Sequence, residues 1–80
     1  MFLREDAMNE AELINKAKQY LKGTYSEDTV SMTVKSNNVE NGTGQMNVDC
    51  TVSVGGEKSN WNKTFHFKNG KVVDMDYQMR

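Results

Sequence analysis

The thiol of Cys50 and the amine of Lys63 are side chains that could together support nucleophilic chemistry. Cys50 and Lys63 both fall on the apolar side of alternating segments, and the strand pairing described below places them opposite each other. An ammonium beside a thiol lowers the thiol pKa and favours the nucleophilic thiolate. In the structural alternative, Cys50 is a small buried core residue and Lys63 carries its charge past the end of a helix into solvent. Both interpretations stay open at the level of the sequence.

A second group of candidates is polar and consists of Asp49, His66, Asp74 and Asp76. All four occupy the polar positions of alternating segments, and the predicted pairing puts His66 one diagonal from Asp49. A histidine beside a carboxylate suits acid–base chemistry, whereas a solvated sheet face is the simpler interpretation. Carboxylates on a flat, open sheet do not enclose and dehydrate an ion, so we expect neither a metal site nor a cofactor.

A helix must lie on the N-terminal side of these candidates. Apolar residues recur at helical spacing over residues 9–22, namely Ala11, Leu13, Ile14, Ala17, Tyr20 and Leu21. Asn9 is the predicted N-cap, Glu12 its capping-box partner and Gly23 the stop signal. Three further apolar residues can extend the helix toward the N-terminus: Phe2, Leu3 and Ala7.

After residue 23 the apolar period changes to two. Apolar and polar residues alternate over residues 29–39, 43–54, 59–67 and 71–79, which predicts four strands with one buried face each. We therefore predict an α+β fold, in which one N-terminal helix packs on the apolar face of a four-stranded antiparallel β-meander. The 80 residues suffice for a single domain with a thin core.

Two Asn-Gly pairs and one Gly-Gly pair set the predicted register. A two-residue turn at 69–70 would place an apolar row opposite a polar row, so we expect a three-residue loop at 68–70 with Gly70 as a bulge residue. The same loop is expected at 40–42, and a four-residue loop at 55–58. The resulting pairs are Val34 with Val48, Met32 with Cys50, Val30 with Val52, Val52 with Trp61, Val48 with Phe65, Cys50 with Lys63, Phe67 with Lys71, Phe65 with Val73, Lys63 with Met75 and Trp61 with Tyr77.

The predicted strands are longer than the helix that covers them. Their rise gives roughly 30 Å, against about 21 Å for the helix. Part of the apolar face is then uncovered, and it carries Trp61, Met75, Tyr77 and Met79. Such a strip suits a dimer interface or a ligand cleft.

The segment 61–73 (WNKTFHFKNGKVV) joins an aromatic strand, an Asn-Gly-Lys turn and an aliphatic strand. With one long helix before a four-stranded meander, it resembles the last hairpin of the cystatin-like superfold, including small relatives of the NTF2-like domains. The resemblance implies a site inside the cone between helix and sheet, where Lys63, Tyr77, Cys50 and Tyr20 are the inward candidates. Neither hairpin loop carries the Gln-x-Val-x-Gly sequence of cystatin-type inhibitors, so protease inhibition is not implied.

Composition excludes some classes of partner. The net charge of −1 and the lack of a basic stripe argue against nucleic-acid binding, and no apolar run approaches the length of a membrane span. The first six residues lack the basic and apolar regions of a signal peptide. With a single cysteine, we expect a cytoplasmic protein, and an exported domain whose leader has been removed stays open.

Four functional hypotheses follow. The first is a non-enzymatic interaction module that forms a homodimer through the uncovered sheet face or the edge of the first strand. The second is a binder of small apolar ligands in the cleft between helix and sheet. The third is a reduced NTF2-like enzyme that uses Cys50 or Tyr77 with Lys63, and the fourth is a phage or mobile-element protein that blocks a host factor.

Overall fold

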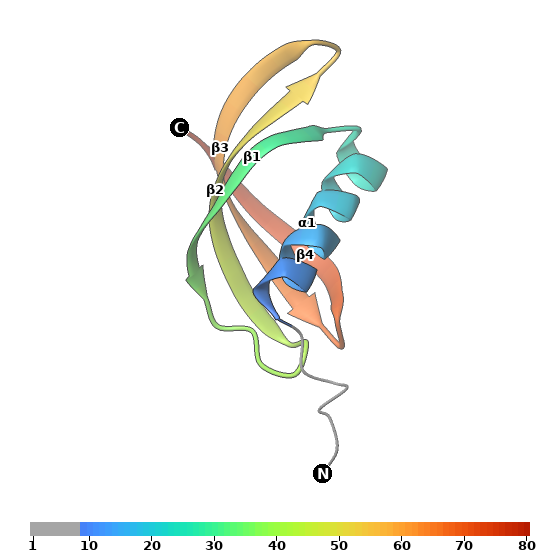
Figure 1. Cartoon of the computed structure of the whole chain (residues 1–80), viewed down its shortest axis with the longest axis vertical. Helices are drawn as coiled ribbons and strands as arrows, with labels where there is room; N and C mark the ends of the chain where they lie inside the picture. The colour runs from blue at the N-terminus through green and yellow to red at the C-terminus, as the bar shows by residue number, and fades with distance from the viewer. Residues whose placement is uncertain (1–8) are drawn as a thin grey trace.

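The computed structural model describes residues 9–80 and shows one helix followed by four strands. The elements are α1 (Glu10–Tyr25), β1 (Asp28–Asn37), β2 (Gly44–Val54), β3 (Glu57–Lys68) and β4 (Lys71–Met79). The strands form one antiparallel sheet in the order β1-β2-β3-β4 (Figure 1). The predicted α+β class and meander are therefore confirmed. The predicted extension through Phe2, Leu3 and Ala7 lies outside the described residues.

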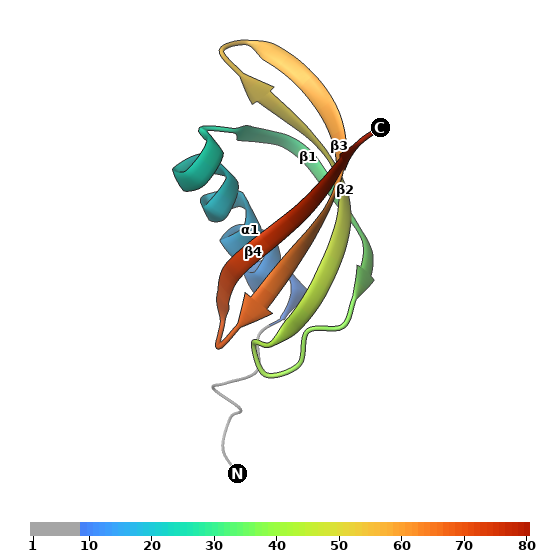
Figure 2. The ribbon, with the colours of Figure 1, turned by 180° about the vertical axis from the view of Figure 1, so that it is seen from behind.

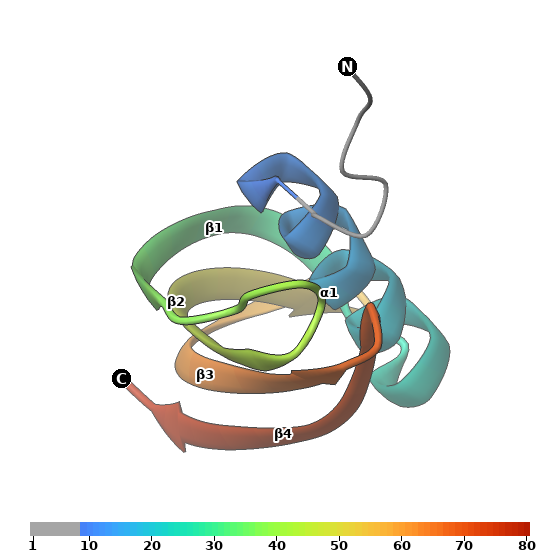
Figure 3. The ribbon, with the colours of Figure 1, turned by 90° about the horizontal axis from the view of Figure 1, so that it is seen from below.

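The sheet is strongly curled, and α1 lies on its open, concave side. Figure 3 shows this curl from below, with the helix between the two edge strands. Accordingly, α1 approaches both β1 and β4. The view from behind shows the β2–β3 hairpin projecting beyond the C-terminal end of the helix (Figure 2). The helix therefore covers only one part of the concave face.

The N-terminus of α1 has the predicted capping box. The side chain of Asn9 accepts a hydrogen bond from the Glu12 amide at 2.9 Å, and the Glu12 carboxylate accepts one from the Asn9 amide at 3.0 Å. The predicted stop at Gly23 is wrong, because the helix continues to Tyr25 and ends at Ser26, whose φ is 58°. A helix tolerates an interior glycine at about 1 kcal/mol, and Tyr25 packs edge-to-face on Tyr20.

The core forms between one stripe of α1 and the concave face of the sheet. The helix contributes Leu13, Ala17 and Leu21, all at most 1% exposed. The sheet contributes Met46, Val48, Cys50, Val52, Phe65, Phe67 and Met75. Lys63 is the one charged side chain among the buried residues of the described chain.

The two Asn-Gly turns are two-residue turns, not the predicted three-residue loops. Asn41 and Gly42 have φ of 53° and 82°, and Asn69 and Gly70 have 54° and 81°, the positive values that a type I′ turn requires. The apolar rows are brought back into phase by bulges inside the strands, between Val34 and Ser36 in β1 and opposite the His66–Phe67 step in β4.

The register of β1 and β2 is largely as predicted. Val34 pairs with Val48, and Met32 pairs with Cys50. The predicted pairing of Val30 with Val52 is wrong, because a second bulge brings Thr29 opposite Val52 and leaves Val30 half exposed.

The register of β2 with β3, and of β3 with β4, differs from the prediction. Trp61, Lys63 and Phe65 each pair with a residue two positions from the predicted partner. Gly55-Gly56 forms a two-residue turn with Val54 opposite Glu57, instead of the predicted four-residue loop. The observed pairs that replace the predicted ones are Ser59 with Val52, Trp61 with Cys50, Lys63 with Val48, Phe65 with Met46, Phe67 with Val72, Phe65 with Met75, Lys63 with Tyr77 and Trp61 with Met79. Lys63 is therefore opposite Val48 and not Cys50, and is diagonal to the thiol.

Candidate functional site

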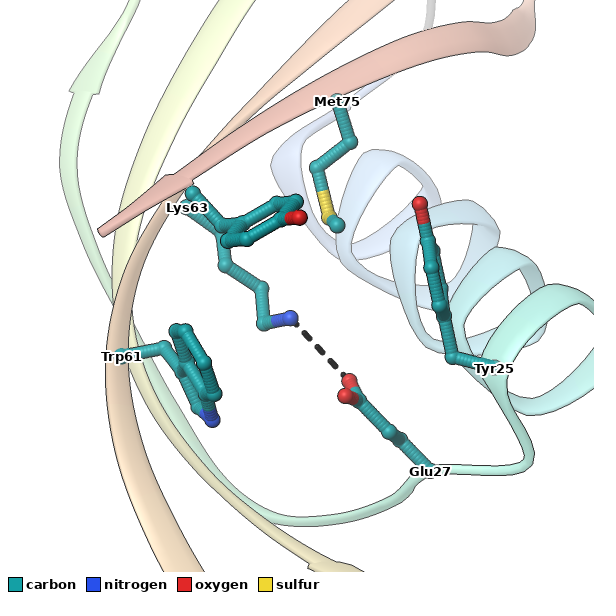
Figure 4. A pocket seen from close by; sticks show the side chains of 6 residues that line it. Tyr25, Glu27, Trp61, Lys63 and Met75 are labelled. Atoms are coloured by element: carbon teal, nitrogen blue, oxygen red, sulfur yellow. Dashed lines mark hydrogen bonds and ion pairs between the residues drawn. The ribbon is translucent and has the colours of Figure 1, made fainter. Parts of the chain in front are cut away.

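A pocket of about 190 Å³ lies where the end of α1 meets the concave face of the sheet. The end of α1, the turn after it and four positions on β3 and β4 form its walls (Figure 4). The lining residues are Tyr25, Glu27, Trp61, Lys63, Met75 and Tyr77. The sheet thus brings together four of the predicted candidates, Trp61, Lys63, Met75 and Tyr77, in one place.

A buried ion pair forms one side of the pocket. The Nζ atom of Lys63 donates to Oε1 of Glu27 at 3.1 Å, and the two side chains are only 2% and 13% exposed. Glu27 follows the C-cap of α1 and is held there by its own amide, which donates to the Leu21 carbonyl at 3.1 Å. Because a buried ammonium without a partner is strongly unfavourable, the pair fixes the α1–β1 connection against β3.

Three aromatic rings surround the same ammonium. The Lys63 Nζ atom lies 5.0 Å from the Trp61 ring centre, 5.7 Å from Tyr77 and 5.8 Å from Tyr25. Trp61 and Tyr77 pack edge-to-face at 5.6 Å. Each distance is within the range of a cation–π interaction. Together with Glu27, the rings form an aromatic cage that a lysine of the same chain occupies.

The mouth of the cage is open to solvent through its tyrosines. Tyr25 is 42% and Tyr77 60% exposed, and the neighbouring Met79 is 62% exposed. Partial burial and the neighbouring Tyr20 raise the pKa of Tyr25 above its ordinary value. The pocket therefore offers apolar ring faces at its entrance and an ion pair at its side.

Cys50 lies outside this lining and is fully buried. Burial raises the pKa of its thiol, and the nearby Lys63 ammonium offsets only part of that effect. The net direction of the thiol pKa therefore does not favour a thiolate activated by Lys63. The lysine directs its charge to Glu27, and the cysteine is a small core residue beside Trp61.

The convex face of the sheet carries an ordered ladder of polar side chains. Asn47 and Asn62 exchange hydrogen bonds at 2.9 and 3.0 Å. Asn47 also donates to Thr64, and Asn62 to Asp49, both at 2.9 Å. These side chains satisfy one another, so the ladder stabilises the sheet on its wet face.

The remaining polar candidates do not form one cluster. His66 contacts Asp76 at 2.8 Å, and not Asp49 as the predicted register implied. Asp74 accepts a hydrogen bond from the Met75 amide, and Asp49 lies near Lys35 and Arg80. Over residues 9–80 no group of three potential metal-ligating side chains is present.

Sequence reasoning missed two members of the cage, Tyr25 and Glu27. Both follow Gly23, where the helix was expected to have ended, and lie in a stretch to which no element was assigned. One signal was present: a lysine at an apolar position of a central strand needs a carboxylate partner. The sequence does not say which of its acidic residues supplies it.

Searches of protein-family profiles, curated proteins and solved structures found no match to this chain. The resemblance to cystatin-like and NTF2-like domains therefore extends only to the layout of a helix and a four-stranded antiparallel sheet. No helix within residues 9–80 has the length and apolar character needed to cross a membrane.

Proposed function

We propose that this protein is a small non-enzymatic binding module that holds a ring-sized ligand in the aromatic cage. One observation carries this proposal: three aromatic rings and a buried ion pair line a pocket that still has about 190 Å³ of space. Ligand sites are typically concave and apolar, with a few placed polar groups. The cage has that composition, and its tyrosines are exposed in the free protein.

Thermal shift with a library of small aromatic fragments tests this proposal. A ligand at 100 times its Kd stabilises the native state by about 2.7 kcal/mol, and each kcal/mol raises the Tm by roughly 4–8 °C in a domain of this size. We expect hits whose effect is lost in Tyr77→Ser, which removes one exposed wall. Val30→Ser is the matched control, because Val30 is similarly exposed and lies outside the pocket. Hits that Tyr77→Ser leaves unchanged would place the binding elsewhere.

A second candidate function is self-association through the apolar side chains of β4. Val73, Tyr77 and Met79 are 58%, 60% and 62% exposed. Pairing of sheet edges is less favourable than burial of this surface, because bulges interrupt both β1 and β4 and bulged edges resist strand addition. Multi-angle light scattering across a concentration series tests it: a homodimer weakened by Met79→Gln supports this candidate, and a monomer at millimolar concentration contradicts it.

A further inference from the structure

The cage contains hydrogen-bond donors that the described chain leaves without an acceptor. A lysine ammonium carries three N–H groups. Within residues 9–80 Glu27 is the one acceptor that Lys63 Nζ meets, at 3.1 Å. The same Nζ atom lies 5.0 Å from the Trp61 ring centre and 5.7 Å from that of Tyr77. Figure 4 shows the Lys63 side chain extending between Trp61 and Glu27. The Lys63 side chain is 2% exposed, and it lines the pocket.

The pocket has room for a single ring with a small substituent. An apolar cavity of about 150 Å³ in another protein is large enough to bind benzene. The pocket, at about 190 Å³, therefore accommodates a six-membered ring and a short polar group. The exposed faces of Tyr25 and Tyr77 at the mouth supply stacking or edge contacts for that ring.

Charge decides which polar group fits. Lys63 and Glu27 are the charged residues that line the pocket, and their charges cancel. A ligand carboxylate would have to compete with Glu27 for the ammonium, and a ligand ammonium would lie beside Lys63. A neutral oxygen acceptor takes a free N–H of Lys63 and leaves the ion pair intact.

We infer that the cage recognises a neutral, ring-sized molecule whose carbonyl or hydroxyl oxygen accepts a hydrogen bond from Lys63 Nζ. This inference rests on the proposed binding function and adds the chemical class of the ligand. Lys63 is in this case a specificity residue, with Glu27 holding its ammonium in place.

Four probes with the same ring but different substituents test the inference: benzamide, benzoate, benzylamine and toluene. Each is titrated into the protein at pH 7, and the Trp61 indole N–H and the Tyr77 amide are followed by NMR. We expect benzamide to bind about tenfold more tightly than the other three, the difference made by one added hydrogen bond to a charged donor.

A neutral double variant isolates the donor. Glu27→Gln with Lys63→Met removes both charges at once and leaves no unpaired ion in the core. We expect benzamide to bind this variant about tenfold more weakly than the wild type, so that its advantage over toluene is lost. The matched control is Lys22→Met with Asp28→Asn, because that pair is bonded at 2.8 Å but its side chains are 62% and 65% exposed. It should leave both affinities unchanged.

The outcomes separate the inference from the proposed function. Equal affinities for benzamide and toluene, or a benzamide affinity that survives the double variant, overturn the inference while the binding module stands. Tighter binding of benzoate or benzylamine also overturns it, because the recognised group is then charged. If none of the four probes shifts the Trp61 and Tyr77 resonances, both proposals fail.

Discussion

At the scale of single residues, the asymmetry of the buried ion pair has a measurable consequence. Lys63 is the deeper partner at 2% exposure, against 13% for Glu27. Glu27→Gln leaves a buried ammonium without its carboxylate, and we expect a loss of about 3 kcal/mol in the free energy of unfolding. Lys63→Met leaves a carboxylate that can turn toward water, so we expect a smaller loss of about 1 kcal/mol in the free energy of unfolding. Urea denaturation of both variants gives the comparison.

The double variant completes this thermodynamic cycle. Replacing a buried ion pair by neutral groups of similar size is often close to neutral, so Glu27→Gln with Lys63→Met should lie near the wild type and above Glu27→Gln. A larger loss of stability in Lys63→Met than in Glu27→Gln would contradict this prediction. The depth of burial of the two charges would then not determine which single change costs more.

Cys50 gives a second prediction at this scale. Its buried thiol has a pKa above the ordinary value, so less thiolate is present at any given pH, and the side chain is 0% exposed. We expect a thiol probe at pH 7 to react far more slowly than with an unperturbed cysteine, and to react at the ordinary rate in urea. Reaction at or above the ordinary rate in the folded state would restore Cys50 as a nucleophile.

At the scale of elements, the two Asn-Gly turns act as one unit. They lie at the same end of the sheet, where the Gly70 amide donates to the Gly42 carbonyl at 2.9 Å and the Asn69 amide donates to Thr43 Oγ1 at 3.2 Å. The first hairpin is therefore joined to the last one across β2 and β3. This contact leaves no room for a side chain at Gly42.

Glycine substitutions measure that contact. A Cβ on Gly42 would lie 2.6 Å from the Gly70 nitrogen, whereas a Cβ on Gly56 would meet nothing within 4 Å. Both residues have φ above 80°, so the conformational cost of about 1–2 kcal/mol is shared. We expect Gly56→Ala to lose about that amount and Gly42→Ala to lose roughly twice as much, by urea denaturation. Equal losses would mean that the turns do not depend on each other.

Hydrophobic alternation predicted the elements, their order and two β1–β2 pairs, Val34 with Val48 and Met32 with Cys50. It did not predict the register of the other strand pairs. The reason is the period of the pattern. A slip of one residue moves every apolar side chain to the wet face, so the sequence excludes it, but a slip of two leaves the apolar rows matched. The predicted pair of Cys50 with Lys63 and the observed pair of Val48 with Lys63 differ by such a slip.

The bulges escaped prediction for a related reason. Either a three-residue loop or a two-residue turn followed by a bulge restores the phase of the apolar rows, and the sequence around Asn69 and Gly70 is compatible with both. The cage was predicted only in its sheet half. Trp61, Lys63, Met75 and Tyr77 follow from alternation, whereas Glu27 and Tyr25 depend on how far α1 continues past Gly23.

At the scale of the whole molecule, one helix is too short for the sheet it covers. The described chain measures 48 × 19 × 19 Å, and the uncovered part of the concave face carries the cage and the exposed side chains of Tyr77 and Met79. Ligand binding and self-association would therefore use the same surface. Tyr77 is a wall of the pocket and part of the apolar face of β4.

This overlap makes the two candidate functions compete, and the competition is measurable. If copies of the chain associate through Tyr77 and Met79, a ligand in the cage must separate them by mass action. We expect the weight-average mass by light scattering to stay that of a monomer when the cage is the functional site, with a benzamide affinity independent of protein concentration. In a dimer formed through the same face, added benzamide would lower the mass, and its apparent Kd would rise with protein concentration. A dimer that benzamide leaves intact, with an unchanged Kd, would place self-association on another face and leave the concave pocket free to bind.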